Sequence, residues 1–441
     1  MSKVGFVSLG CAKNLVDTEV MLAKLAEAGY EITPEAEDAD VVVINTCAFI
    51  ESAKSESIET IIDIGWLKEH HKLKGIVVCG CMAERYGEQI KNELPEVDAI
   101  VSLGSIDSIV EAVKKAEKGE KAYYMDIDKE KMPLGGDRVL TTGTMAYLKI
   151  AEGCDNRCTY CAIPLIRGNM RSRPMEDIVK EAEDLEKLGV KELCIIAQDT
   201  SRYGLDLYGD YKLAELIRKI SAATQIPWIR LLYLYPDKIT DELIEEMKNN
   251  PRVVKYADIP IQHISDNMLK AMGRHGGKDV VCDAIKRLRD AIPGITLRTT
   301  VMVGFPGETE EDFAELCDFV KKTKFDRLGA FTYSPEEDTA AAELPDRIDE
   351  QVKQDRYDAI MQIQLEISAA RNRKLIGRKM RVLCENFDIP AECYVGRSEA
   401  DAPDVDGKVF FVSDRKHRDG QFVTVRITEA EDYDLIGEAL A

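Results

Sequence analysis

Residues 151–161 read Ala151-Glu-Gly-Cys-Asp-Asn-Arg-Cys-Thr-Tyr-Cys161, which places three cysteines in a C-x-x-x-C-x-x-C run. The run directly follows the apolar segment 146–150, so the cysteines should lie on a loop at the end of a strand. Three thiolates at this spacing can hold three corners of an iron–sulfur cluster, which four cysteines ordinarily ligate. One iron would stay open for another ligand. The alternatives are a zinc site, which prefers paired C-x-x-C units, and three unrelated buried thiols.

Around this run, residues 141–374 alternate strand-like and helix-like segments. We predict strands at 146–151, 192–198, 228–234, 256–262, 296–303 and 328–333, and helices at 175–188, 211–222, 240–249, 277–291, 309–322 and 348–374. Six strand–helix units indicate an open, partial (β/α)6 barrel. Functional groups should then gather at the carboxyl ends of the strands, where the cysteine run stands.

Residues 1–140 repeat the alternation with shorter units. Apolar runs at 4–9, 41–45, 75–78 and 98–101 are separated by helical patterns near 14–29, 53–70 and 83–93. Continuous apolar strands between helices predict a parallel α/β domain with both faces covered. The polar stretch 126–143 has the composition of a linker.

Cys11, Cys47 and Cys81 each follow one of these predicted strands. Because the carboxyl ends of parallel strands share one edge, we expect the three thiols to meet there and to bind a metal. The alternative is that they are small buried apolar residues, as free cysteines usually are. Cys79 lies inside a strand and is expected to be packed.

Residues 375–441 change character. Short strand patterns at 379–383, 391–395, 408–412 and 421–427, separated by turn residues, predict a small antiparallel β-barrel. The predicted fold class is therefore α/β, with an amino-terminal parallel α/β domain (1–140), a central partial barrel (141–374) and a carboxyl-terminal β-barrel (375–441).

The composition of the chain limits its cellular compartment and the kind of partner that it binds. The chain has 441 residues, of which 45% are apolar, and no segment approaches the roughly 20 apolar residues of a membrane span. The amino terminus has no signal-peptide layout, and twelve cysteines then favour metal or catalytic use in the cytoplasm over disulfides. The formal net charge of −21 favours a basic partner over free nucleic acid.

Longer motifs resemble a known family. Gly5-Phe-Val-Ser-Leu-Gly-Cys-Ala-Lys-Asn14, 45–51 and 80–86 are similar to the amino-terminal domain of the methylthiotransferases. The stretches 152–164, 167–174 and 303–313 resemble their radical S-adenosylmethionine (SAM) core, and residues 375–441 resemble a TRAM domain. The resemblance covers essentially the whole chain. Ala12 departs from it, since the family often has proline there.

Within this family the chain resembles the RimO type more than the tRNA-modifying MiaB type, on the segments 197–204, 333–338, 396–407 and 432–437. The RimO type inserts a methylthio group at the β-carbon of an aspartate of small-subunit ribosomal protein number twelve. The alternative is the same reaction on a tRNA adenosine. A non-catalytic iron–sulfur or zinc protein with an RNA-binding barrel is a further alternative.

Charge in the third domain favours the same choice. Between residues 385 and 407 one base, Arg397, stands against seven acids, Glu385, Asp388, Glu392, Glu399, Asp401, Asp404 and Asp406. A barrel that binds tRNA should be basic. We therefore predict an acidic face for a basic ribosomal protein, with a merely solvated acidic surface as the alternative.

The resemblance implies two 4Fe–4S clusters. The core cluster, on the catalytic residues Cys154, Cys158 and Cys161, would bind SAM through its open iron and cleave it to a 5′-deoxyadenosyl radical. The second, on Cys11, Cys47 and Cys81, would hold the sulfur to be transferred. An electron donor such as flavodoxin or ferredoxin is implied, and nucleic acid is not the primary partner.

Contacts to SAM are expected from Tyr160, Gln198, Asp199 and Arg298. Tyr160 could instead serve loop packing, and Arg298 could instead pair with a structural acid. His263 is expected to be a hydrogen-bonded structural residue.

Overall fold

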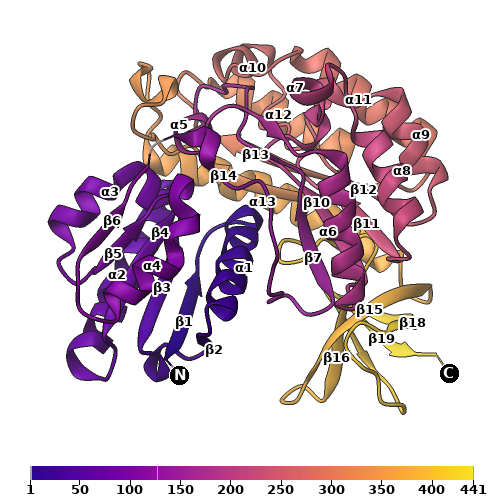
Figure 1. Cartoon of the computed structure of the whole chain (residues 1–441). Coiled ribbons are helices and arrows are strands. Elements are labelled where there is room, and N and C mark those ends of the chain that lie inside the picture. Colours follow the sequence, from indigo (N-terminus) through magenta and orange to yellow (C-terminus); the bar gives the residue numbers. More distant parts are fainter. Residues whose placement is uncertain (1, 127, 441) are drawn as a thin grey trace.

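The computed structural model describes residues 2–126 and 128–440, and its ribbon falls into three parts (Figure 1). The amino-terminal part is a parallel sheet in the order β2-β1-β3-β4-β5-β6. Its strands are β1 (Lys3–Ser8), β2 (Glu31–Thr33), β3 (Val41–Thr46), β4 (Gly75–Gly80), β5 (Ala99–Val101) and β6 (Ala122–Tyr124). Its helices are α1 (Ala12–Glu27), α2 (Glu51–His70), α3 (Cys81–Glu93) and α4 (Ile109–Ala116). The predicted parallel α/β domain is confirmed. The edge strands β2 and β6 are short and were not predicted.

The central part is an open parallel sheet in the order β14-β13-β12-β11-β10-β7. Its strands are β7 (Met145–Lys149), β10 (Glu192–Ile196), β11 (Trp228–Leu231), β12 (Val253–Asp258), β13 (Thr296–Val303) and β14 (Arg327–Thr332). The covering helices are α6 (Met175–Lys187), α8 (Leu213–Ala223), α9 (Asp241–Asn249), α11 (Gly277–Ala291), α12 (Glu310–Thr323) and α13 (Glu350–Arg373). This confirms the open (β/α)6 barrel.

Shorter elements decorate the loops of the first two parts. They are β8 (Ala151–Glu152), β9 (Arg171–Ser172), α5 (Ile163–Arg167), α7 (Leu205–Tyr208) and α10 (Asp266–Ala271). The 3-10 turns are η1 (Ala36–Asp38), η2 (Leu103–Ser108), η3 (Lys129–Lys131), η4 (Thr200–Arg202), η5 (Pro236–Lys238) and η6 (Ala340–Glu343). Among the described residues, no helix has both the length and the apolar character that crossing a membrane requires.

The carboxyl-terminal part is a closed barrel in the order β15-β16-β17-β19-β18. Its strands are β15 (Lys379–Asp388), β16 (Cys393–Ser398), β17 (Val409–Val412), β18 (Phe422–Ala430) and β19 (Leu435–Ala439). The small barrel is confirmed, with one qualification: β17 and β19 pair in parallel, whereas the other neighbouring strands are antiparallel. The exact domain boundaries at 140 and 374 stay predictions.

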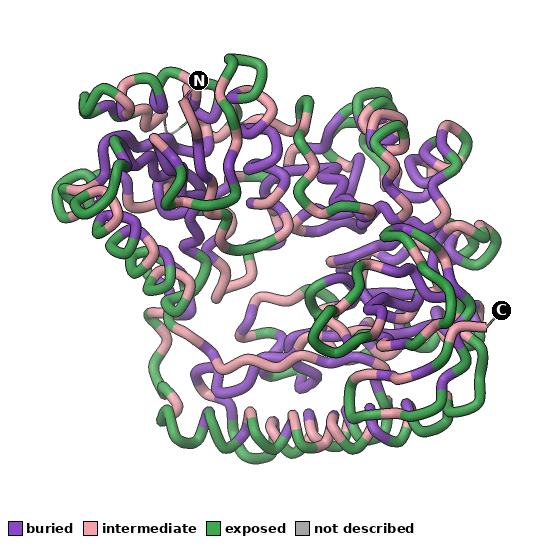
Figure 2. Tube along the Cα trace, turned by 90° about the horizontal axis from the view of Figure 1, so that it is seen from below, coloured by how far each residue is buried: buried purple, intermediate pink, exposed green. Residues whose placement is uncertain are grey.

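The three parts share buried surface. Val16 of α1, Tyr147 of β7 and Leu383 of β15 belong to one apolar cluster, so each part contributes to it. In Figure 2 the strands run as buried segments through the molecule, while the outer helices alternate between buried and exposed residues. The segment 126–143, predicted as a linker, is anchored where it is described: the side chain of Arg138 is buried and pairs with Glu19 and Glu181.

The acidic stretch 385–407 is turned inward over part of its length. Asp401 pairs with Arg327 of β14, and Asp406 lies 3.5 Å from Arg298 of β13 and accepts a hydrogen bond from Tyr256 at 2.6 Å. The prediction of an acidic face is therefore wrong for these two carboxylates. They lie against the barrel sheet because its arginines need buried counter-charges.

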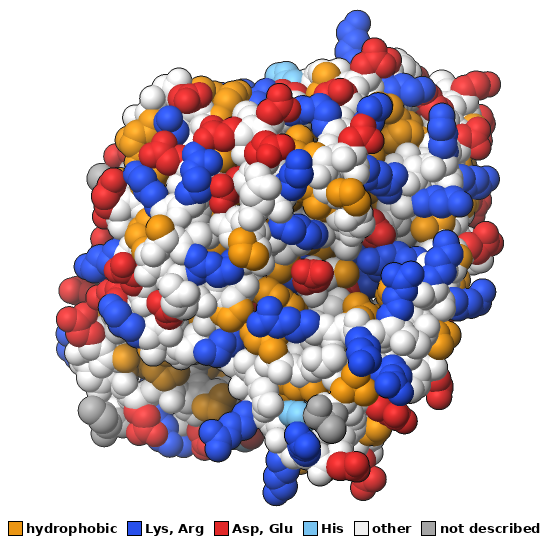
Figure 3. Space-filling model, turned by 90° about the vertical axis from the view of Figure 1, so that its right-hand side faces the viewer, with side chains coloured by type: hydrophobic (Ala, Val, Ile, Leu, Met, Phe, Trp, Pro, Cys, Tyr) orange, Lys and Arg blue, Asp and Glu red, His pale blue; other side chains and the backbone are white. Residues whose placement is uncertain are grey.

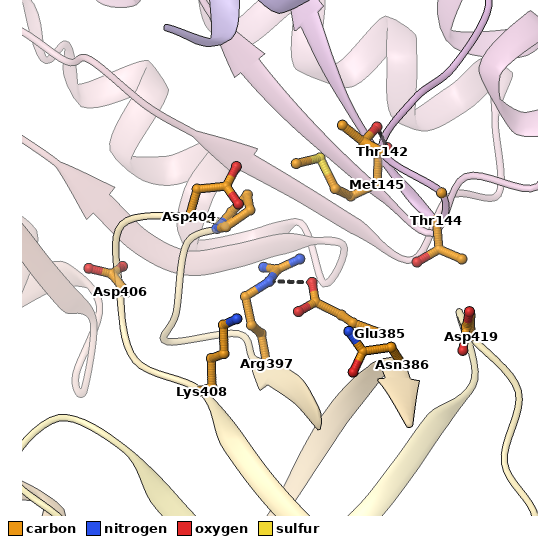
Figure 4. Close-up of a pocket in the computed structure, with 12 residues that line it drawn as sticks. Thr142, Thr144, Met145, Glu385, Asn386, Arg397, Asp404, Asp406, Lys408 and Asp419 are labelled. Carbon is orange, nitrogen blue, oxygen red and sulfur yellow. Dashed lines mark hydrogen bonds and ion pairs between the residues drawn. The ribbon is translucent and has the colours of Figure 1, made fainter. Parts of the chain in front are cut away.

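A small cavity of about 280 Å³ remains at this junction. Figure 4 shows Arg397 and Glu385 side by side on the third domain and joined by a dashed line, and Asp404 and Lys408 also line the cavity. Arg397 also donates to Glu192 of β10 at 2.7 Å, which ties the third domain to the barrel. These charges hold the two parts together, and the described lining of this cavity includes none of the six cysteines of the two predicted sets.

Candidate active site

A cavity of about 1100 Å³ lies between the amino-terminal sheet and the barrel. All six cysteines of the two predicted sets line it, namely Cys11, Cys47, Cys81, Cys154, Cys158 and Cys161. They stand where the strands of both parallel sheets end, as the positions of β1, β3, β4 and β7 dictate. The topology thus brings the two sets to opposite walls of one space.

Two glycines allow the amino-terminal cysteines to approach each other. Gly80, directly before Cys81, has φ +91°, and a Cβ there would lie 2.2 Å from Asn45 Oδ1. Gly10, directly before Cys11, has φ +89°, and its Cβ would lie 3.0 Å from the Cβ of Cys47. A side chain at either position would collide with a neighbour and strain the backbone. These glycines are therefore part of how the sequence builds this cysteine set.

The sulfur of Cys81 contacts two polar side chains. It lies 3.4 Å from Asn14 Oδ1 and 3.6 Å from Arg167 Nη2. Arg167 comes from α5 of the barrel domain and also donates to Asp17 at 3.0 Å and to Glu152 at 2.9 Å. A single buried guanidinium thus joins a cysteine of the first domain to the barrel.

Lys149 completes this buried network. Its ammonium donates to Asp17 at 2.6 Å and to Glu152 at 2.9 Å, and Gln198 donates to the other oxygen of Glu152 at 2.7 Å. Two cations therefore face two carboxylates away from water. Burial would raise the pKa of Glu152, but Arg167 and Lys149 outweigh it and keep that pKa below its ordinary value.

The core cysteines have aromatic and cationic neighbours. The hydroxyl of Tyr235 lies 3.9 Å from Cys158 Sγ, and the guanidinium of Arg274 stands 4.1 Å from the centre of the Tyr235 ring. Arg274 also donates to the hydroxyl of Tyr160 at 3.4 Å. These three side chains form a polarisable wall beside the cysteine loop.

Burial decides the protonation of several of these thiols. It raises the pKa of Cys154 to about 11, and the pKa values of Cys81 and Cys161 to about 12. The guanidinium of Arg167 only partly opposes the shift at Cys81. At neutral pH these thiols are therefore protonated unless a metal takes the proton's place.

The donor set fits iron–sulfur clusters better than zinc. Within residues 2–126 and 128–440, no three His, Cys, Asp or Glu side chains converge tightly enough to hold one metal ion. A structural zinc site takes four converging protein ligands and a catalytic one takes three. A cluster places each thiolate on a different iron, so its cysteines must stand apart around a space.

The polar wall of the cavity also offers hydrogen-bond acceptors to a ligand. The side-chain oxygens of Asn156, Gln198 and Gln262 line it, are buried, and have no hydrogen-bond partner among the described residues. Buried polar atoms are normally paired. A ligand with several N–H and O–H donors, such as the amino acid, ribose and adenine groups of SAM, fits this wall.

The predicted SAM contacts divide into two groups. Tyr160 and Gln198 line the cavity, whereas Asp199 and Arg298 are not among its described lining residues. Asp199 is buried behind Asn156 and accepts from its amide at 2.7 Å. Arg298 forms an ion pair with Asp258 at 2.9 Å, the arrangement expected if it pairs with a structural acid instead of SAM. Arg298 lies near the start of β13, whereas Thr300 and Met302, further along that strand, line the cavity. Its position along the strand therefore explains why Arg298 is not among the described lining residues.

Sequence reasoning missed several lining residues, including Asn156, Tyr235, Gln262 and Arg274. Tyr235 follows the predicted strand 228–234 and Gln262 ends the predicted strand 256–262, so their place at a strand end was a usable signal. Arg274 follows α10 and carries no such signal. His263 is structural as predicted: it is buried, faces Glu308 at 3.1 Å and accepts from the Ser265 amide at 3.0 Å.

Comparison with known proteins places these features in families. Residues 148–320 match the radical SAM superfamily, residues 3–102 match uncharacterized protein family UPF0004, and residues 376–440 match the TRAM domain. The ribosomal protein uS12 methylthiotransferase RimO of Thermoanaerobacter sp. (strain X514) is 49% identical over 439 residues, covering 99% of this chain and 100% of that protein. The protein so named from Caldicellulosiruptor saccharolyticus is 49% identical over 443 residues, covering 100% of both. The chain belongs to the RimO family.

As a RimO-family member, the chain is a radical SAM methylthiotransferase that uses SAM and two 4Fe–4S clusters. Solved structures show the same fold at greater distance. The radical SAM methyltransferase TsrM from Kitasatospora setae, with cobalamin and a [4Fe-4S] cluster bound, has a TM-score of 0.55 at 14% identity, covering 76% of this chain and 74% of that one. The radical enzyme OxsB has a TM-score of 0.51 at 14% identity, covering 82% and 56%.

Proposed function

We propose that this chain inserts a methylthio group at the β-carbon of an aspartate of ribosomal protein uS12, small-subunit ribosomal protein number twelve. The observation that carries the proposal is the shared cavity, because both cysteine sets line it. A side chain inserted between them lies within reach of both. We assign Cys154, Cys158 and Cys161 to the core cluster and Cys11, Cys47 and Cys81 to the second cluster.

When bound, SAM and the two clusters supply the electron, the radical and the sulfur that the reaction needs. The protein supplies position and exclusion of water. Gln198 and Asn156 offer acceptors that orient SAM, and Tyr160 lies directly before Cys161 in the same wall. Apolar side chains such as Ile163, Met302 and Phe331 line the remaining wall and keep water from a reactive carbon centre.

The proposed reaction also indicates an electron donor, a cellular compartment and the kind of partner. A small electron carrier such as flavodoxin or ferredoxin would deliver the electron, and the reaction would take place in the cytoplasm, where ribosomal proteins are made and assembled. Nucleic acid is not the primary partner, because a chain with a net charge of −21 repels phosphates over most of its surface.

The test is a competition between substrates. The anaerobically reconstituted enzyme is given SAM, sulfide and a strong reductant, with uS12 and tRNA offered together. Mass spectrometry of both products then locates the methylthio group. A gain on an aspartate of uS12 supports the proposal, whereas a gain on tRNA nucleosides keeps the chemistry and overturns the substrate.

Metal analysis of the same preparation separates the zinc-protein form of the non-catalytic alternative. Two 4Fe–4S clusters require about eight irons per chain with matching sulfide. A zinc protein with an RNA-binding barrel would contain neither.

A further inference from the structure

Large apolar side chains stand exposed along α2 and the turn before it. Within the described residues, Phe49, Ile50, Ile58, Ile62 and Trp66 are 37%, 36%, 37%, 51% and 54% exposed. We call these five residues the α2 stripe. Ile58, Ile62 and Trp66 follow each other at intervals of four residues, so they lie along one face of the helix. The adjoining face, with Ile61 and Ile64, is buried in the domain.

Ile62 and Trp66 in the stripe are each more than half exposed. Trp66 stacks on His70 of the same helix, with ring centres 4.5 Å apart, rather than on the core. On the face in Figure 3 apolar side chains lie scattered among interspersed acids and bases. Soluble proteins rarely expose aligned apolar residues without a partner to cover them.

The stripe begins at the active-site cavity. Phe49 and Ile50 line that cavity together with the six cysteines, and α2 leads away from it over the outside of the domain. A protein that inserts one side chain between the two cysteine sets must lay its adjoining surface over the cavity mouth. The α2 stripe continues the cavity wall onto the surface where that protein would rest.

The charges on α2 indicate what the partner looks like. The exposed side chains with a formal charge on this helix are acidic, namely Glu51, Glu56, Glu59, Asp63 and Glu69. Both lysines are half-buried in ion pairs, Lys54 with Glu51 and Lys68 with Asp98. An acidic margin beside an apolar line attracts a basic protein surface and repels nucleic acid or an acidic electron carrier.

We propose that the α2 stripe is the docking surface for the protein substrate, binding basic and apolar side chains next to the aspartate that enters the cavity. This inference rests on the proposed function and names the surface that recognises its substrate. A ribosomal protein has the required chemistry, because it binds RNA phosphates through lysine and arginine.

The test compares intact uS12 with a short peptide that carries only the target aspartate and its neighbours. The double variant Ile62→Ser/Trp66→Ser should raise the KM for intact uS12 about tenfold, as expected for the loss of a buried interface anchor. The peptide, too short to reach the far end of α2, should be modified at the parent's KM. A general structural defect would impair both substrates.

Leu188→Ser is the matched control. Leu188 is 59% exposed at the end of α6, outside the cavity and the stripe, and its replacement should leave both KM values at the parent's level. A second variant, Glu59→Lys/Asp63→Lys, should also raise the KM for intact uS12 and reduce its dependence on salt. This variant keeps the apolar residues, so it tests the charge argument even if the serine variant folds poorly.

The outcomes are distinct. Parent-like KM values for intact uS12 in both variants would overturn the docking surface while leaving the proposed function intact. An equal rise in the Leu188→Ser control would also overturn it. If the parent enzyme modifies neither uS12 nor the peptide, the proposed function fails and the assignment of this surface fails with it.

Discussion

The two cysteine sets line the same cavity, yet the chain assembles them in opposite ways. Cys154, Cys158 and Cys161 lie in one loop that its own backbone orders, with the Cys161 amide donating to Cys158 and the Cys154 amide donating to Gly168. Cys11, Cys47 and Cys81 come from three separate strand ends and meet only because the sheet brings those ends together. The core set depends on local spacing, whereas the amino-terminal set depends on tertiary packing.

The largest effect should come from removing each set in turn. Replacement of Cys154, Cys158 and Cys161 by alanine should abolish SAM cleavage, because the core cluster loses its ligands, while about four of eight irons remain. Replacement of Cys11, Cys47 and Cys81 should retain SAM cleavage and abolish methylthio transfer. Iron analysis and product chromatography check both. Cleavage that survived the first replacement would contradict the assignment of the core.

The next effect concerns Arg167, whose buried guanidinium contacts the Cys81 sulfur of the amino-terminal set. Arg167→Met should destabilise the protein by about 3–5 kcal/mol, because it leaves Asp17 and Glu152 under-compensated. It should also lower the reduction potential of the amino-terminal cluster, since that cluster loses a positive charge and a donor near the Cys81 sulfur. The potential is measured by redox titration in the background that lacks the three core cysteines.

Lys149→Met is the matched control for Arg167. Lys149 pairs with the same two carboxylates, and within the described part of the chain it forms no hydrogen bond to a cysteine. Its loss should cost similar stability and leave the potential almost unchanged. Equal shifts in potential for the two variants would contradict a specific role of Arg167. The double variant Arg167→Met/Asp17→Asn keeps the charge balance and serves if the single variant does not fold.

A smaller effect is expected at the glycines of the amino-terminal set. Gly80→Ala should cost about 2–4 kcal/mol and lower the occupancy of that cluster, because its Cβ would meet Asn45 and the backbone of Thr46. Gly29→Ala has a similar φ of +90° with nothing within 4 Å, so only about 1–2 kcal/mol of backbone strain is expected there. Chemical denaturation measures both. Equal costs would show that the close approach at Gly80 is unimportant.

The smallest effects separate the predicted SAM contacts. Gln198→Ala should weaken SAM binding about tenfold, because it removes a hydrogen-bonding group from the cavity wall. Arg298→Met should leave SAM affinity within about twofold, since Arg298 is held by Asp258 and Asp406 outside that wall. Equilibrium binding of SAM to the reconstituted protein measures both. A large loss of affinity in Arg298→Met would support the prediction that Arg298 contacts SAM.

Local pattern alone determined much of this protein. The spacing of Cys154, Cys158 and Cys161 and the strand–helix alternation predicted the core loop, both parallel sheets and the small barrel. These features can be predicted from the sequence because they depend on residues close together in the chain. The amino-terminal set could be predicted too, because parallel strands share a carboxyl edge.

Only the tertiary structure decided where the remaining charges go. Asp401 and Asp406 stand in a stretch that reads as an acidic surface, yet they lie against arginines of the barrel sheet. Arg167 looks like an ordinary loop arginine until the packing of two domains places it beside Cys81. The physical reason is that burial and ion pairing depend on which distant segments meet, and no local spacing in the sequence encodes that meeting.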